Sequence, residues 1–168
     1  LKKKKSTLST ADYANTMQLT KIEGKGFLKE SERSHEIINK ECLNGTFSGS
    51  RSAYSTVILV MDSKDKWPFH KLKSSETFKH IDGKDIIVHL VNSNWEYKKL
   101  YIGKENENAI TELTINPGIW YAIEVDGNSG YAHIEATNKP SYDIDDVEQA
   151  GEDFYQELMA HNVAVDTK

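Results

Sequence analysis

The sequence has little cysteine, no long apolar run and no excess of positive charge. Cys42 is the only cysteine among 168 residues, which excludes an intramolecular disulfide and a zinc site built on several cysteines. No segment approaches the roughly 18 uninterrupted apolar residues of a membrane-spanning helix. Acidic residues outnumber basic ones by 26 to 21, whereas nucleic-acid binders usually carry a basic excess. We therefore expect neither a nucleic acid nor a membrane as a partner.

The remaining composition is that of one folded domain. Hydrophobic residues make up 38% of the chain, too large a share for a disordered protein of modest net charge. Residues 1–20 include the basic run Lys2–Lys5 and show no sustained periodicity, so we predict a flexible basic tail followed by a single domain over residues 21–168. The chain begins with Leu1, which we interpret as a trimmed or processed start, and we predict no compartment.

The middle of the chain has the pattern of short β-strands. The run YSTVILVM from Tyr54 is rich in β-branched residues and too short for a typical helix. Further strands are predicted at 69–72, 76–81, 85–91, 95–102, 109–115, 119–125 and 131–136, with an extra edge strand around 20–27. Turn residues such as Asp82-Gly83 separate them. This regular spacing is typical of an antiparallel sandwich or barrel.

The periodicity changes near the C-terminus. Apolar residues recur at helical spacing from Val147 to Met159. We predict one amphipathic helix over about 145–161, lying on the β-structure, with Asp143 or Asp145 as its N-terminal cap.

One stretch resembles the cupins, small β-barrels recognised by two sequence motifs. The residues at the spacing of these motifs are His70, Leu72, Glu76 and Gly83 for the first and Asn116, Gly118 and Tyr121 for the second. The segments FHKLKSSETFKHIDGKDI, INPGIWYAI and KPSYDIDDVE are similar to FHRLKSDEIWHFYAGDPL, VPAGVWQAA and APGFDFADFEL of one uncharacterised small-cupin family. Their order and spacing hold from about Gly45 to Glu148.

The resemblance implies an all-β fold, a cupin-type antiparallel jelly-roll barrel with a ligand cavity inside, to which the C-terminal amphipathic helix is added. It also implies a homodimer, since cupins often form one. It implies no particular reaction, because cupins include epimerases, isomerases, dioxygenases, decarboxylases, binding proteins and storage proteins. We therefore expect a homodimer that binds a small organic molecule, and whether it is an enzyme stays open.

Metal chemistry is one alternative that the resemblance implies. In a metal cupin, two histidines and a glutamate of the first motif and a histidine of the second bind the ion. Here His70 and Glu76 occupy two of these positions, while Leu72 and Tyr121 occupy the others, and leucine cannot ligate. We predict no cofactor. His70 and Glu76 remain the candidate ligands of a divalent metal, in a metal-dependent enzyme with a reduced ligand set.

A metal-free reaction is the other alternative. His70, Glu76 and Tyr121 would form an acid–base group, similar to that of metal-free sugar epimerases and isomerases with the same barrel. His70 suits the base because imidazole titrates near neutrality, whereas Tyr121 suits the acid by position alone. In the simpler interpretation, His70 and Glu76 are a hydrogen-bonded pair in a binding cavity.

The remaining site residues are predicted to bind the ligand through apolar surface. They are Trp67, Leu72, Phe78 and Trp120. Large aromatic side chains stack on ring-shaped ligands, but they pack equally well in a core. If such side chains fill the barrel, a protein that acts only through its surface becomes a third interpretation.

Overall fold

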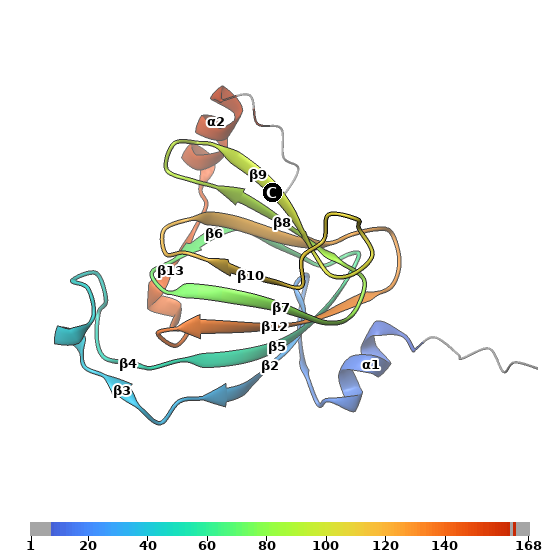
Figure 1. Ribbon diagram of the computed structural model, residues 1–168, viewed down its shortest axis with the longest axis horizontal. Helices are drawn as coiled ribbons and strands as arrows, with labels where there is room; N and C mark the ends of the chain where they lie inside the picture. Colours follow the sequence, from blue (N-terminus) through green and yellow to red (C-terminus); the bar gives the residue numbers. More distant parts are fainter. Residues whose placement is uncertain (1–7, 162, 164–168) are drawn as a thin grey trace, which may run out of the picture.

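The computed structural model describes residues 8–161 and 163 and consists of two antiparallel β-sheets packed face to face (Figure 1). The six-stranded sheet has the order β1-β2-β5-β12-β7-β10, and the five-stranded sheet has the order β13-β6-β11-β8-β9. A small separate sheet pairs β3 with β4. This is the jelly-roll architecture that the resemblance implies.

The strands are mostly short and lie where alternation or β-branched runs occur. In the six-stranded sheet they are β1 (Thr20–Ile22), β2 (Gly26–Arg33), β5 (Ser55–Asp62), β7 (Ser75–Gly83), β10 (Glu112–Ile115) and β12 (Tyr131–Lys139). In the five-stranded sheet they are β6 (Lys66–Leu72), β8 (Ile86–Val91), β9 (Tyr97–Ile102), β11 (Trp120–Val125) and β13 (Val147–Gln149). The remaining elements are α1 (Thr10–Thr16), β3 (Ile37–Ile38), η1 (Lys40–Cys42), β4 (Arg51–Ser52), η2 (Ile144–Asp146) and α2 (Glu152–Ala160).

The strands predicted between Tyr54 and Ala136 are all present, with ends shifted by a few residues. The edge strand expected around 20–27 is a hairpin of β1 and β2. The closed barrel that the resemblance implied is not what the structure shows: the two sheets form an open sandwich. Within the described residues, the open edges β9 and β10 are linked near their ends by one isolated bridge, Ile102 to Ile110, and no ladder forms between them.

The space between the sheets is filled by a continuous apolar core. A bulge in β6 decides which residues reach it: Tyr121 pairs with His70, but Ile123 pairs with Trp67, so Pro68 and Phe69 face a single residue of β11. Strict alternation would turn Trp67 and His70 to opposite faces. The bulge directs both of them inward and leaves Phe69 on the outer face.

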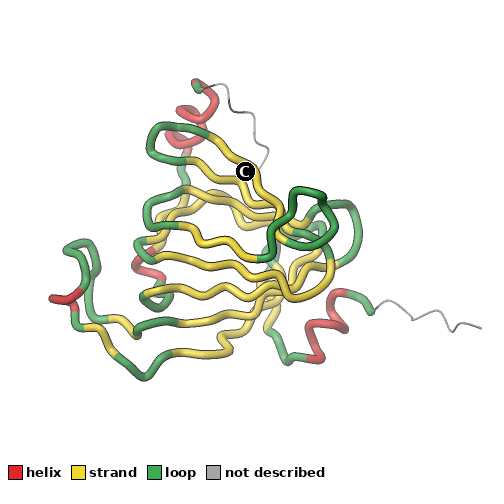
Figure 2. The backbone as a smooth tube through the Cα atoms, in the orientation of Figure 1, coloured by secondary structure: helices red, strands yellow, loops and turns green. Residues whose placement is uncertain are grey.

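Each sheet has a helix on its outer face, and Figure 2 shows the two helices at opposite sides of the sandwich. Helix α2 packs Phe154 and Leu158 against Phe69 of the five-stranded sheet. Helix α1 packs Ala14 against Val60 of the six-stranded sheet. Neither described helix has the length and apolar content needed to cross a bilayer.

Two predictions about the chain ends need correction. Within the expected tail, Thr10–Thr16 form α1, because Ser9 caps it by accepting the Asp12 N–H and Ala14 buries its methyl group; residues 1–7 lie outside the described residues. The segment 145–161, predicted as one helix, is divided in the structure among three elements: the end of η2, the strand β13 and the helix α2. The backbone of Val147–Gln149 pairs with β6, so the helix starts only after Gly151.

Candidate functional site

The three predicted catalytic residues lie together between the sheets. The Tyr121 hydroxyl donates a hydrogen bond of 2.8 Å to Glu76 Oε1, and the rings of His70 and Tyr121 have centroids 4.3 Å apart. Strands β11, β7 and β6 contribute one residue each. Tyr121 is 1% exposed and Glu76 is 8% exposed, so this pair is part of the core, whereas His70 is half-buried.

Burial controls the ionisation of the pair. It raises the pKa of Glu76, although the hydrogen bonds from Tyr121 and from the Asn138 side chain act in the opposite direction. Burial and the adjacent Glu76 charge hold the pKa of Tyr121 well above its ordinary value. Tyr121 therefore keeps its proton at neutral pH and serves Glu76 as a neutral hydrogen-bond donor.

The tautomer of His70 follows from its one hydrogen bond. Nδ1 lies 2.8 Å from the Pro68 carbonyl oxygen, which only accepts, so Nδ1 carries the proton. Burial lowers the pKa of His70, and the Pro68 contact opposes this only in part. The hydrogen bonds of the described residues include none to His70 Nε2. His70 is therefore a neutral imidazole with a free lone pair on Nε2.

Three of the four predicted ligand-binding residues lie on the inner face. Leu72 and Phe78 are buried in the core. Trp67 is half-buried and packs on the core, and its Nε1 donates to the Lys25 carbonyl at 3.1 Å. Trp120 lies on the opposite face of β11 from Tyr121 and packs on Phe154 of α2, with ring centroids 4.7 Å apart. Trp120 thus belongs to the outer aromatic cluster and is not with the other three.

Two clefts are lined in part by the β10–β11 turn. This turn lies below the β8–β9 hairpin at the left of Figure 1. The first, here called the strap cleft, has a volume of about 390 Å³ and is lined by Asn44, Thr46, Lys71, Leu72, Lys73, Pro117, Gly118 and Asp145–Glu148. The second, called the hairpin cleft, has a volume of about 380 Å³ and is lined by Leu90, Asn92, Glu96, Tyr97, Lys98, Thr114, Ile115, Asn116 and Ile119. The β10–β11 turn contributes to both.

The floor of the hairpin cleft is next to the Tyr121–Glu76 pair. Leu90 is the direct cross-strand partner of Tyr121, and Ile115 is the partner of Glu76. Directly paired residues on one face have Cβ atoms about 4.5–5.5 Å apart. A molecule resting on Leu90 and Ile115 therefore lies one side chain away from the buried carboxyl group.

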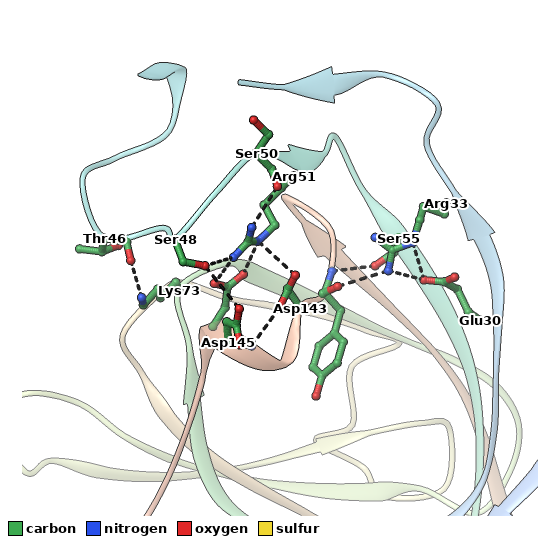
Figure 3. Close-up of polar contacts among 12 residues, drawn as sticks. Glu30, Arg33, Thr46, Ser48, Ser50, Arg51, Ser55, Lys73, Asp143 and Asp145 are labelled. Carbon is green, nitrogen blue, oxygen red and sulfur yellow. Dashed lines mark hydrogen bonds and ion pairs between the residues drawn. The ribbon is translucent and has the colours of Figure 1, made fainter. Parts of the chain in front are cut away.

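The wall of the strap cleft is held by a buried ion pair. Arg51 donates two hydrogen bonds of 2.9 Å to the Asp146 carboxylate, and Figure 3 shows its guanidinium directed toward Ser48 and Asp143 as well. Lys73, which directly follows β6, donates from its Nζ to the Thr46 carbonyl and so connects the segment around Thr46 to the end of that strand. These contacts fix the segment around Thr46–Ser48 over the cleft.

The residues present do not fit the metal centre of a cupin. Within the described part of the chain, no three His, Cys, Asp or Glu side chains come close enough to hold an ion. Leu72 occupies one of the four expected positions, and the Tyr121 hydroxyl is already bonded to Glu76. His80 lies further along β7, where its Nε2 is 3.0 Å from the Lys84 carbonyl. We derive no chemical step through a metal.

Several residues of the site were not foreseen. Asn138, the second hydrogen-bond partner of Glu76, is 2% exposed and continues the inward series Ala132, Ile134, Ala136. A polar residue at the end of an apolar alternation is a signal that was available in the sequence. The Arg51–Asp146 pair had no such signal, because 95 residues separate its members.

The fold and the position of the site define a cupin. The chain matches the family described as Cupin superfamily (DUF985) over residues 11–150, and it belongs to this family. None of the curated proteins compared with the chain matches it significantly.

Solved structures agree on the fold. A hypothetical protein from Leishmania major is 21% identical with a TM-score of 0.79, over 94% of this chain and 96% of that one. A protein from Shewanella oneidensis is 14% identical with a TM-score of 0.77, over 96% and 100%. Oxalate decarboxylase from Bacillus subtilis is 12% identical with a TM-score of 0.56, over 88% of this chain and 35% of that one. At these identities the likeness concerns the fold alone.

Proposed function

We propose that this cupin binds a small organic molecule in the hairpin cleft, beside the Tyr121–Glu76 pair. The volume of about 380 Å³ falls in the range of ligand pockets, roughly 300–1,000 Å³. Its floor of Leu90, Ile115 and Ile119 is apolar, with polar side chains at the rim. An apolar floor with a few polar groups is the usual composition of a small-molecule site.

The observation that carries the proposal is that two floor residues are cross-strand partners of the buried polar pair: Ile115 pairs with Glu76, and Leu90 pairs with Tyr121. Ionisable groups cost free energy inside an apolar core, and Glu76 and Tyr121 are placed there next to the floor of a cleft. Perturbed groups beside a cleft favour a binding or catalytic role over a purely structural one.

Acid–base catalysis by His70 and Tyr121 stays a prediction that the geometry does not favour. Such a reaction needs the base and the acid on opposite faces of one substrate carbon. The two rings are 4.3 Å apart, and the Tyr121 hydroxyl is bonded to Glu76. In this arrangement no substrate carbon fits between the rings. Binding without chemistry is the simpler function for the same residues.

A screen of small sugars, amines, alcohols and organic acids tests the proposal, with thermal shift and ligand-observed NMR as readouts. Ile119→Trp fills the hairpin cleft, and the matched control Thr46→Trp puts the same bulk into the strap cleft. We expect compounds that bind the wild type and the Thr46→Trp variant but not the Ile119→Trp variant. The proposal is wrong if no compound binds, or if binding survives Ile119→Trp and is lost in Thr46→Trp.

A further inference from the structure

Helix α1 covers a histidine on the outer face of the six-stranded sheet. His133 of β12 lies between the inward-facing residues Ala132 and Ile134, so its ring points outward. It is 7% exposed, and the ring of Tyr13 in α1 meets it edge-on, with centroids 5.7 Å apart. The burial of His133 therefore depends on α1 being in place.

Only one of the two ring nitrogens of His133 has a hydrogen-bond partner. Nδ1 lies 2.9 Å from the Tyr13 hydroxyl, whereas Nε2 is buried and has no partner among the described residues. A neutral imidazole tolerates this arrangement, because the unpartnered position can be a lone pair. An imidazolium carries N–H groups on both nitrogens, so its Nε2–H would be a buried donor without an acceptor, at a cost in free energy.

The strands beside His133 supply two carboxylates but no acceptor for Nε2. Asp82 of β7 is its cross-strand partner, and Glu135 lies on the same face of β12. Both carboxylates attract an imidazolium, but neither forms a hydrogen bond with the buried Nε2. Asp82 is exposed, so water screens its charge.

The other groups around the ring are neutral or would repel a positive charge. The phenols of Tyr13 and Tyr131 have raised pKa values and keep their protons, and Val60 of β5 is apolar. A protonated His80 on β7 would repel an imidazolium. Burial has the largest effect, and the pKa of His133 lies below its ordinary value of 6.5.

We infer that His133 and Tyr13 form an acid-sensitive latch, which holds α1 on the sheet at neutral pH and releases it when His133 is protonated. Release exposes Nε2 to water, which supplies the missing acceptor, and uncovers Phe27, Ile58 and Val60 beneath the helix. Local release is sufficient because α1 has only seven residues. Within the described part of the chain, the Tyr13 hydroxyl makes its only side-chain hydrogen bonds to the sheet.

Acid weakens the docking of α1, and alkali does not. With α1 docked, the pKa of His133 is lowered, and with α1 undocked the exposed ring returns toward 6.5. Docking is therefore at full strength above about pH 6.5 and weakens as the pH falls below it. It is weakest once the pH has passed the lowered pKa of the docked state.

Hydrogen exchange of the wild-type protein at about pH 7.5 and about pH 5 tests the latch, because this interval spans the titration of histidine. Each rate is divided by the intrinsic exchange rate at the same pH, which gives a protection factor. We expect the protection of α1, relative to that of β5, to fall at least about threefold at the lower pH. An unchanged ratio overturns the inference.

Two variants assign the effect to His133. His133→Gln removes the titrating group and keeps an amide beside Tyr13, so we expect its protection ratio to stay within about 1.5-fold between the two pH values. His35→Gln removes an exposed histidine and is expected to behave like the wild type. A loss in His133→Gln as large as in the wild type overturns the inference.

An NMR titration of the wild-type imidazoles decides the question if α1 does not dock in the His133→Gln variant at either pH. We expect His133 to titrate below about pH 6.5 and in step with the loss of protection in α1. Titration of His133 at or above that pH overturns the inference.

Discussion

Glu76 is a carboxyl group inside an apolar core, and its stability contribution depends on pH. Burial raises its pKa from the ordinary value of 4.5. A raised pKa in the folded state means that its contribution is intact below about pH 4.5 and declines as the pH rises through the folded-state pKa. The Glu76→Gln variant has no such loss. We expect its melting temperature, relative to the wild type, to increase from acidic to alkaline pH in calorimetry. A difference that does not vary with pH would contradict this.

The Arg51–Asp146 pair is the buried ion pair whose loss we expect to cost most. Both side chains are nearly inaccessible, at 6% and 2% exposure. Asp146→Asn leaves the guanidinium without its counter-charge, and we expect a loss of about 3–5 kcal/mol in urea unfolding. The control is Glu30→Gln in the exposed Arg33–Glu30 pair, where the expected loss is below about 1 kcal/mol. Similar losses in the two variants would refute the role of burial.

At the scale of elements, α1 is fastened to the six-stranded sheet by one tyrosine. Tyr13 stacks on Tyr131 with ring centroids 4.0 Å apart, and its hydroxyl donates to Asp82 and lies 2.9 Å from His133 Nδ1. Burial and the Asp82 charge raise the pKa of Tyr13 to about 12. Because its single proton goes to Asp82, the His133 Nδ1–H must donate to the Tyr13 oxygen.

Tyr13→Phe removes both polar contacts of α1 and keeps the ring stacking. We expect faster hydrogen exchange over Thr10–Thr16, by about tenfold, with little change in β5. This corresponds to the roughly 1–2 kcal/mol of two lost hydrogen bonds. The matched control is Tyr54→Phe, which removes an exposed bond to Glu32. Unchanged exchange in α1 would show that apolar packing alone holds the helix.

The loop after β9 is organised by a single carboxylate. Asp85 accepts the backbone N–H groups of Lys104, Glu105 and Asn106 at 2.8, 3.0 and 2.7 Å. Burial opposes the ionisation of Asp85, but the three N–H groups outweigh it and its pKa is lowered. Gly103 is needed beside it, since a Cβ there would lie 1.8 Å from Asp85 Oδ1.

We expect Asp85→Ala to lose at least about 3 kcal/mol, because three backbone donors lose their acceptor. Asp85→Asn should lose less, since one oxygen remains. The lowered pKa predicts that the contribution of Asp85 is present above about pH 3.8 and is lost as the pH falls below it. Urea unfolding at several pH values measures both effects, and an equal loss in the two variants would contradict the assignment.

For the whole molecule, the homodimer implied by the cupin resemblance stays a prediction. Exposed apolar residues of the described chain include Ile37 at 60% and Ile144 at 70%. Light scattering at micromolar concentration measures the oligomeric state, and a monomer there would contradict the prediction.

Local sequence patterns were sufficient to predict most of the strands of the fold. Alternation and β-branched runs predicted the strands from Tyr54 to Ala136, because each such strand buries at least one face against the core or a helix. The inward positions of Glu76 and Phe78 followed from the same alternation. Helix α1 was missed because it is short and buries little more than Ala14, so its local sequence carries no visible apolar period.

The sequence by itself determined the cupin class, the strands and the inward-facing candidates His70, Glu76 and Tyr121. Only the tertiary structure decided that Trp67 and His70 share a face, because a bulge is a matter of register between two strands. It also placed Leu90 and Ile115 beside the Tyr121–Glu76 pair and joined Arg51 to Asp146. Contacts between residues far apart in the chain depend on how the strands pair, and no local pattern encodes that pairing.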